Sequence, residues 1–93
     1  MVFSNLLTIS KLTSALTSKT LAELKGSALS GSLTRLVLKP HTSTDSIYWN
    51  TGAASASTDK LPSEGIPLDI TKNLADTIQI YGDSKLLTMI ELG

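Results

Sequence analysis

A chain of 93 residues has room for one small domain, and its eight basic residues are balanced by eight acidic ones. No basic stripe is available to follow a phosphate backbone, so the electrostatic footprint of a nucleic-acid-binding protein is missing. Cysteine is absent, which excludes a disulfide, a thiolate metal site and a thiol nucleophile.

Residues 1–31 form the first predicted unit, an apolar arm that is also rich in Ser and Thr. Its apolar residues recur at steps of three and four, at Val2, Leu6, Ile9, Leu12 and Leu16. This spacing is typical of a helix with an apolar stripe, so we expect the arm to be partly helical. A second short helical segment is expected after Ser18, with Gly26 as its stop and a linker at residues 26–32.

Residues 32–93 form the second predicted unit, a β domain. Apolar and polar residues alternate there, and five main strands are expected at 33–39, 46–50, 66–70, 77–82 and 85–92. The polar loop 53–65 holds a short edge strand at 53–57, and residues 71–76 form a turn. We therefore predict a mainly β fold, a small antiparallel β-sandwich or jelly-roll-like barrel with an N-terminal helical or extended arm.

The apolar stripe of the arm has three interpretations. It either covers an open face of the β domain or packs on a neighbouring subunit, and the sequence leaves these two close to balance. A membrane surface is disfavoured, because only Lys11 and Lys19 supply the basic residues that such a helix usually carries. The longest uninterrupted apolar run is three residues, far short of a membrane span.

Two of the four aromatic residues, Tyr48 and Trp49, are neighbours on the expected strand 46–50. Adjacent side chains on a strand point to opposite faces, so one ring should enter the core while the other faces outward. The outward ring is a contact anchor for another protein or a platform for a sugar. Alternatively, it covers the sheet edge or packs under the loop 53–65.

Catalytic and metal-binding patterns are not recognisable. His41 is the only histidine, and although Ser43 and Asp45 are near it in sequence, a solvated loop residue is the favoured interpretation. The acidic residues are dispersed, and one histidine without cysteine does not provide the common transition-metal ligand sets. We predict no catalytic residue, no cofactor and no metal, and the protein is not expected to be an enzyme.

The order of short motifs is the most specific feature of the β domain. The strand with "IYWNTG" is followed by "LPSEGIPLDI", by "IQIYG" and by a last apolar strand that ends in "EL". Residues 35–92 thereby resemble small virion proteins of tailed and other phages, such as head decoration or cement proteins, spike and fibre bases and minor tail components. The resemblance implies a β-sandwich or jelly-roll-like unit, often trimeric, with an N-terminal arm that reaches the capsid or a neighbour. Its matching positions are structural, so no functional site carries over from them: Leu61, Pro62, Gly65, Ile66, Leu68 and Ile70.

Together these features predict a non-enzymatic virion structural protein that decorates or cements a capsid as a homo-oligomer, with a trimer favoured. Its partners would be other copies and the major capsid or another virion protein, in the virion and, during assembly, in the host cytoplasm. The alternative is a small β binding module that recognises carbohydrate or a host surface through Tyr48, Trp49 and the loop 53–65. The predicted interface residues are Phe3, Leu6, Leu7, Leu12, Tyr48 and Trp49.

Overall fold

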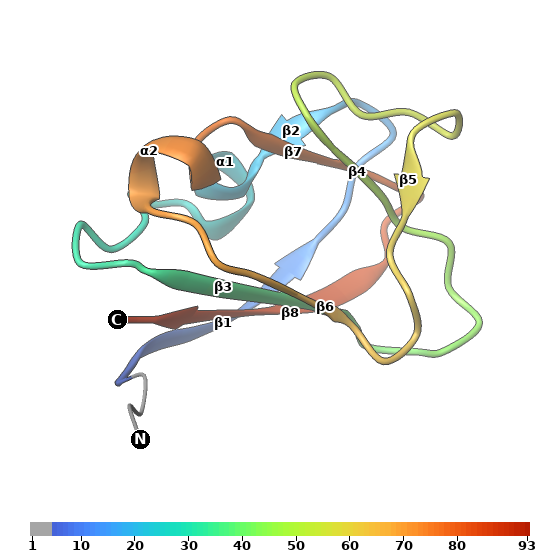
Figure 1. Ribbon diagram of the computed structural model, residues 1–93. Coiled ribbons are helices and arrows are strands. Elements are labelled where there is room, and N and C mark those ends of the chain that lie inside the picture. The colour runs from blue at the N-terminus through green and yellow to red at the C-terminus, as the bar shows by residue number, and fades with distance from the viewer. Residues whose placement is uncertain (1–4) are drawn as a thin grey trace.

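The computed structural model describes residues 5–93, which form eight strands and two short helices (Figure 1). In chain order these are β1 (Leu6–Thr13), β2 (Lys19–Thr20), α1 (Leu21–Lys25), β3 (Arg35–Pro40), β4 (Tyr48–Thr51), β5 (Asp59–Lys60), β6 (Ile66–Leu68), α2 (Lys72–Ala75), β7 (Ile78–Tyr81) and β8 (Leu86–Leu92). The fold is mainly β, as predicted. In this part of the chain neither helix is long and apolar enough to cross a membrane, since α1 has five residues and α2 has four.

The strands form two four-stranded antiparallel sheets, one on each side of the core (Figure 1). Sheet A has the strand order β1-β8-β3-β6, and sheet B has the order β2-β7-β4-β5. Every pairing between neighbouring strands is antiparallel. β1 in sheet A and β2 in sheet B both come from residues 1–31, so strands from both sides of residue 31 share the same two sheets.

The helix predicted for the start of the chain is wrong over Leu6–Thr13, which is the extended strand β1. β1 pairs with β8 from Leu6↔Leu92 to Thr13↔Leu86, and this ladder supplies its backbone hydrogen bonds. The Thr, Ser and Ile residues between the leucines are mediocre helix formers, and the β-branched Thr and Ile suit a strand, so pairing with β8 outweighs the helical spacing. Val2 lies outside the described residues. The short helical turn expected between Ser18 and Gly26 is present as α1.

Helix α1 begins with a capping box at Thr20. The Thr20 backbone N–H and hydroxyl donate to Glu23 Oε1 at 3.0 Å each, and the Glu23 N–H donates back to Thr20 Oγ1 at 3.2 Å. The hydrogen bond from the Thr20 backbone, with help from its hydroxyl and from the charge of Lys19, lowers the pKa of the Glu23 carboxyl. The helix ends at Gly26, whose φ of 81° is the left-handed conformation that glycine adopts without strain.

The lowered pKa of Glu23 predicts an acid-dependent loss of stability. A carboxyl whose pKa is lower in the folded state stabilises the fold above its unfolded-state pKa, and this contribution disappears as the pH falls through the folded-state pKa. Glu23→Gln keeps the capping hydrogen bonds but does not titrate. Urea unfolding should therefore show that the unchanged chain loses more of its free energy of unfolding than Glu23→Gln does when the pH falls from about 7 to about 3. A difference that is independent of pH would contradict this assignment.

The core lies between the two sheets and follows the alternation of each strand. Leu36 and Leu38 of β3 and Leu87 and Met89 of β8 face inward from sheet A. From the other side, the buried residues Ile47, Ile78 and Ile80 close the core. The exposed surface of 5149 Å² is close to the ~5,200 Å² expected of a compact domain of this mass, so the two sheets bury a core without help from a second chain.

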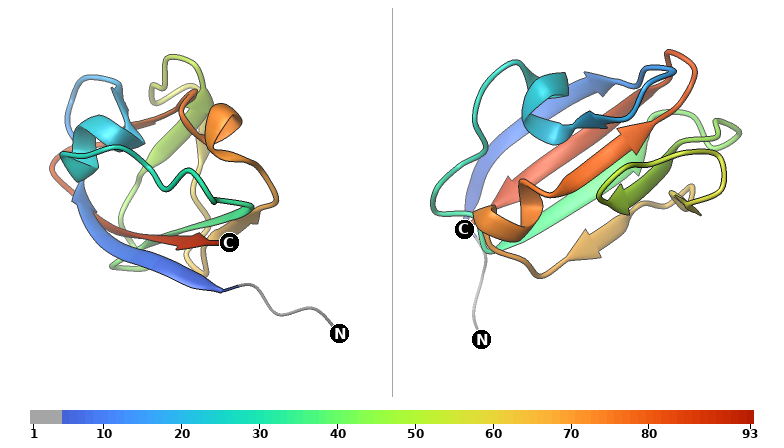
Figure 2. Two further views of the ribbon diagram at one scale, coloured as in Figure 1. Left: turned by 90° about the vertical axis from the view of Figure 1, so that its left-hand side faces the viewer. Right: turned by 90° about the horizontal axis from the view of Figure 1, so that it is seen from above.

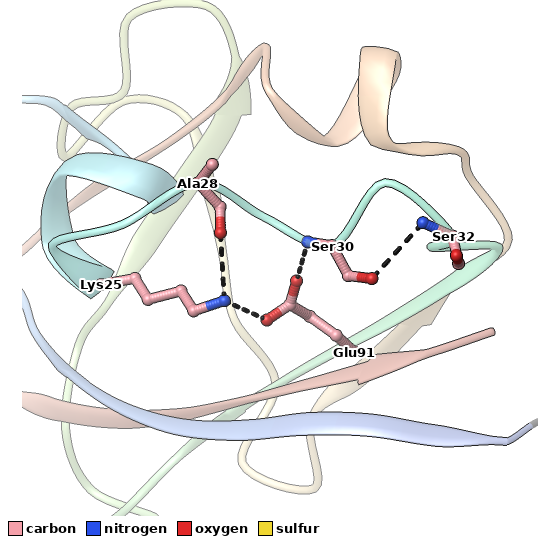
Figure 3. A network of polar contacts seen from close by, with 5 residues as sticks. All are labelled: Lys25, Ala28, Ser30, Ser32 and Glu91. Atoms are coloured by element: carbon pink, nitrogen blue, oxygen red, sulfur yellow. Dashed lines mark hydrogen bonds and ion pairs between the residues drawn. The ribbon is translucent and has the colours of Figure 1, made fainter.

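The crossover between α1 and β3, residues 26–34, is held to sheet A by Glu91 of β8 (Figure 3). Glu91 is fully buried because it shares the inner face of β8 with Leu87 and Met89. Its Oε2 is 2.8 Å from Lys25 Nζ, and its Oε1 accepts the Ser30 backbone N–H at 2.7 Å. Both carboxylate oxygens therefore have a partner, one at the end of α1 and one in the crossover.

Candidate interaction surfaces

The outer face of sheet A carries an apolar row that crosses all four strands. The register places Ile9, Ile90, Val37 and Pro67 side by side, one residue from each strand. Ile9 is 58% exposed and Pro67 is exposed, while the other two are half-buried. We call this row, with the flanking exposed side chains, the sheet A surface; the flanking residues are Leu6 and Leu86.

A positive row lies beside this apolar row. Lys11 of β1 and Lys39 of β3 are both opposite Thr88 of β8, and both lysines are exposed. No acidic residue belongs to β1, β3 or the outward positions of β8 in this region. The sheet A surface therefore combines an apolar strip with two cations at one side.

Strand β1 is one of the two edge strands of sheet A, and β6 is the other (Figure 2, right). The Ser14 N–H donates to the Lys85 carbonyl at 2.9 Å, so the backbone groups of Ser14 face β8. Because these directions alternate along an antiparallel strand, the N–H and C=O groups of Ile9, Lys11 and Thr13 face away from β8. Within residues 5–93 no further strand pairs with them, which leaves an unpaired backbone edge.

The other three sheet edges carry features that discourage pairing. β6 has three residues, and Pro67 in its middle has no N–H to donate. β5 consists of two charged residues, and β2 has two residues before the chain turns into α1. β1, by contrast, has eight residues with Lys11 as its one charge. It is the longest of the four edges, although α1 packs against part of it.

The two neighbouring aromatic residues face opposite sides of sheet B. Trp49 is opposite Ile80 of β7 and packs against the core, where it is partly buried. Tyr48 is on the outer face, opposite Tyr81 of β7, with ring centroids 6.3 Å apart and ring planes at 47°. The structure thereby shows which ring faces outward, and it adds Tyr81 as a second ring that sequence spacing did not single out.

The predicted interface residues fall in different environments. Leu6 is 59% exposed and Leu7 lies beside the β-bulge of β1, also exposed. Leu12 is 1% exposed and belongs to the core between the sheets, so it is not available to a partner and its assignment to an interface is corrected. The reason is that Leu12 lies on the inward face of a strand, whereas a helix would have placed it on one stripe with Ile9 and Leu16. Phe3 lies outside the described residues.

Sequence reasoning missed Ile9, Leu86 and Ile90 as members of a common surface. The helical spacing places Ile9 in a helix stripe, and the outward positions of β8 become informative only once their neighbours across the sheet are known. Residues 9–13 gave no signal of period two, since their apolar residues, Ile9 and Leu12, are three positions apart and lie on opposite faces of β1.

No side-chain hydrogen bond links His41, Ser43 and Asp45 in the described part of the chain. His41 is exposed, and the Asp45 carboxylate lies 3.8 Å from Lys85 Nζ. Over residues 5–93, no group of three or more His, Asp or Glu side chains is placed to hold a metal ion, and no pocket is found. The candidate sites are therefore the two outer sheet faces and the edge of β1.

Comparison with known proteins adds no family assignment: no family model, curated protein or solved structure matches this chain.

Proposed function

We propose that this protein is a non-enzymatic structural protein that assembles through the edge of β1 and the sheet A surface. The single observation that carries the proposal is that β1 is a long edge strand with a single charge, whereas the other edges are short, charged or interrupted by proline. A strand from a neighbouring copy that adds to β1 would satisfy the outward N–H and C=O groups of Ile9, Lys11 and Thr13. It would also cover part of the exposed side chains of Leu6 and Ile9.

The resemblance of residues 35–92 to small virion proteins supports a more specific role. In that role the domain is a β-sandwich or jelly-roll-like unit that decorates or cements a capsid, with copies of itself and the major capsid or another virion protein as partners. A trimer is the favoured state, because the virion proteins that residues 35–92 resemble are often trimeric. The protein would be located in the virion and, during assembly, in the host cytoplasm.

The attraction in this assembly is expected to be mainly short-ranged. The eight basic and eight acidic residues balance, and the proposed contact is formed by backbone groups and apolar side chains. Screening by salt acts on Coulombic attraction between exposed charges and leaves such contacts largely unchanged. The mass of the assembly should therefore vary little between low and moderate salt concentration.

A proline at position 11 tests the edge directly. The Lys11 N–H faces away from β8, so Lys11→Pro removes an outward donor while the β1–β8 ladder keeps its own hydrogen bonds. We expect the unchanged chain to form a trimer or larger species in light scattering coupled to size exclusion, and the variant to have an association constant at least about tenfold lower.

The matched control is Lys11→Ala, which removes the same charge and keeps the N–H. It should assemble like the unchanged chain, while the far-ultraviolet circular dichroism of both variants stays that of a β protein. A monomer in the unchanged chain would overturn the proposal, and equal assembly of Lys11→Pro and Lys11→Ala would exclude β1 as the contact.

A further inference from the structure

The outer face of sheet B presents a pair of aromatic rings to solvent. Tyr48 and Tyr81 are directly opposite each other on β4 and β7, with ring centroids 6.3 Å apart, and both side chains are half-buried. Neither helix lies over β4 in the view from above (Figure 2, right). The rings therefore form a partly exposed apolar platform in the middle of an otherwise polar face.

The next pair on the same face consists of two amides, Asn50 and Gln79. They are opposite each other in the register and two residues away from Tyr48 and Tyr81 along their strands. Residues two apart on a strand point to the same side and are separated by about 6.7 Å. The aromatic pair and the amide pair are thus adjacent on one surface.

Both amides are held in a defined orientation by the protein. Ser18 Oγ accepts the Ala54 backbone N–H at 2.8 Å, and its hydroxyl hydrogen is donated to Gln79 Oε1 at 2.6 Å. The Asn50 side-chain NH₂ donates to the Ala53 carbonyl at 3.0 Å. These bonds use the oxygen of Gln79 and the nitrogen of Asn50.

What remains for a ligand is one donor and one acceptor side by side. The NH₂ group of Gln79 and Oδ1 of Asn50 make no hydrogen bond with another residue in the described part of the chain. Each hydroxyl of a sugar both donates and accepts, so two neighbouring hydroxyls match this pair. The C–H groups on one face of a pyranose ring are apolar and match the platform of Tyr48 and Tyr81.

We propose that the outer face of sheet B binds a pyranose ring of a neutral oligosaccharide. The ring would lie on Tyr48 and Tyr81, while two adjacent hydroxyls bond Gln79 Nε2 and Asn50 Oδ1. The amides of Gln79 and Asn50 are already oriented, so they lose little conformational freedom when a ligand binds. This preorganisation favours a functional binding site over an incidental contact. The face covers only one side of the sugar, and residues 53–54 of the loop after β4 border the amide pair, so the affinity should lie in the millimolar range.

This site is independent of the assembly surface, because it lies on the opposite sheet. An assembled protein would use sheet A for its neighbours and keep Tyr48 and Tyr81 exposed. The assembly-deficient variant Lys11→Pro is therefore expected to bind the sugar like the unchanged chain, so the two proposals can fail separately.

The test is a titration of the ¹⁵N-labelled full chain with cellohexaose, maltohexaose, xylohexaose and chitohexaose at millimolar concentrations. At least one should shift the backbone amide signals of β4 and β7 in a saturable manner, while the signals of β1 stay in place. Fluorescence of Trp49 is a poor probe, because that ring packs against the core.

Variants distinguish the proposed contacts from a nonspecific effect. Gln79→Met keeps the length of the side chain but removes the amide, and Tyr81→Leu removes the ring; each should weaken binding at least about fivefold. Leu86→Thr on the sheet A surface is the matched control and should bind normally. Dispersed amide spectra establish that each variant is folded. If one of Gln79→Met and Tyr81→Leu does not fold, the other alone tests the proposal. Absence of saturable shifts with all four sugars, or unchanged affinity in a folded Gln79→Met or Tyr81→Leu variant, would overturn the proposal.

Discussion

Replacing Lys25 with methionine should lower the free energy of unfolding by about 3 kcal/mol. The Lys25 side chain is 14% exposed, and its ammonium group lies 2.8 Å from Glu91 Oε2, whose side chain has no exposed surface. Without the ammonium group, a buried carboxylate would keep only the hydrogen bond from the Ser30 N–H. Losing one partner of a buried ion pair costs about 3–5 kcal/mol, and the remaining hydrogen bond places Lys25→Met at the low end.

A matched control separates burial from charge. Lys72 and Asp76 also form an ion pair, at 2.7 Å, but about a third of each side chain is exposed. Lys72→Met should therefore cost no more than about 0.5 kcal/mol in the same urea unfolding experiment. Similar losses for the two lysine variants would show that burial of Glu91 does not set the effect.

A double-mutant cycle identifies the carboxylate as the origin of the loss. Glu91→Gln removes the charge but keeps an acceptor for the Ser30 N–H, so Lys25→Met should cost much less in that background. The coupling between the two positions should be about 1–3 kcal/mol. Additive effects would mean that Lys25 stabilises the crossover through its contact with the Ala28 carbonyl, at 3.2 Å, rather than through Glu91.

Gly65→Ala should lower the free energy of unfolding by about 3 kcal/mol, the sum of two separate costs. Gly65 has a φ of 85°, in the left-handed region where a Cβ atom is strained. A Cβ at this position would also lie 2.8 Å from the Leu38 carbonyl oxygen and 2.9 Å from Lys39 Cβ, closer than van der Waals contact allows. Strand β3 would have to move away from the turn that leads into β6.

Gly26 provides the control for Gly65, because its φ of 81° is nearly the same but a Cβ added there would meet nothing within 4 Å. Gly26→Ala should therefore show only the conformational cost, about 1–2 kcal/mol. The difference between the two alanine variants in thermal or urea unfolding measures the clash alone. Equal losses would indicate that β3 relaxes without cost.

The strands of the β domain could be predicted because their signals are local. Alternating residues such as Leu36 and Leu38, or Ile78 and Ile80, lie between residues that form turns, and the structure has β3, β4, β6, β7 and β8 near the expected positions. β5 is the exception, since it lies at Asp59–Lys60 instead of at 53–57. Its two residues have no apolar alternation and are defined only by their pairing with β4.

The features that decide the candidate sites depend on contacts between distant residues. β1 is a strand because β8 pairs with it, and the buried carboxylate of Glu91 is compensated by Lys25, 66 positions earlier, which provides its counter-charge. The platform on sheet B likewise requires that Tyr81 lies opposite Tyr48. Neighbouring residues in the sequence carry no information about such pairs, so a polar Glu91 near the end of an apolar strand gave no sign of its role.

The position of β8 between β1 and β3 also sets an order of events during synthesis. β1 and β3 leave the ribosome well before β8, yet neither has another long partner strand in sheet A. A nascent chain therefore carries the apolar residues of both strands unpaired until β8 emerges, and contacts so distant in sequence form slowly. During this interval the nascent chain is most exposed to aggregation, so its yield should depend on chaperones more than the stability of the finished domain would indicate.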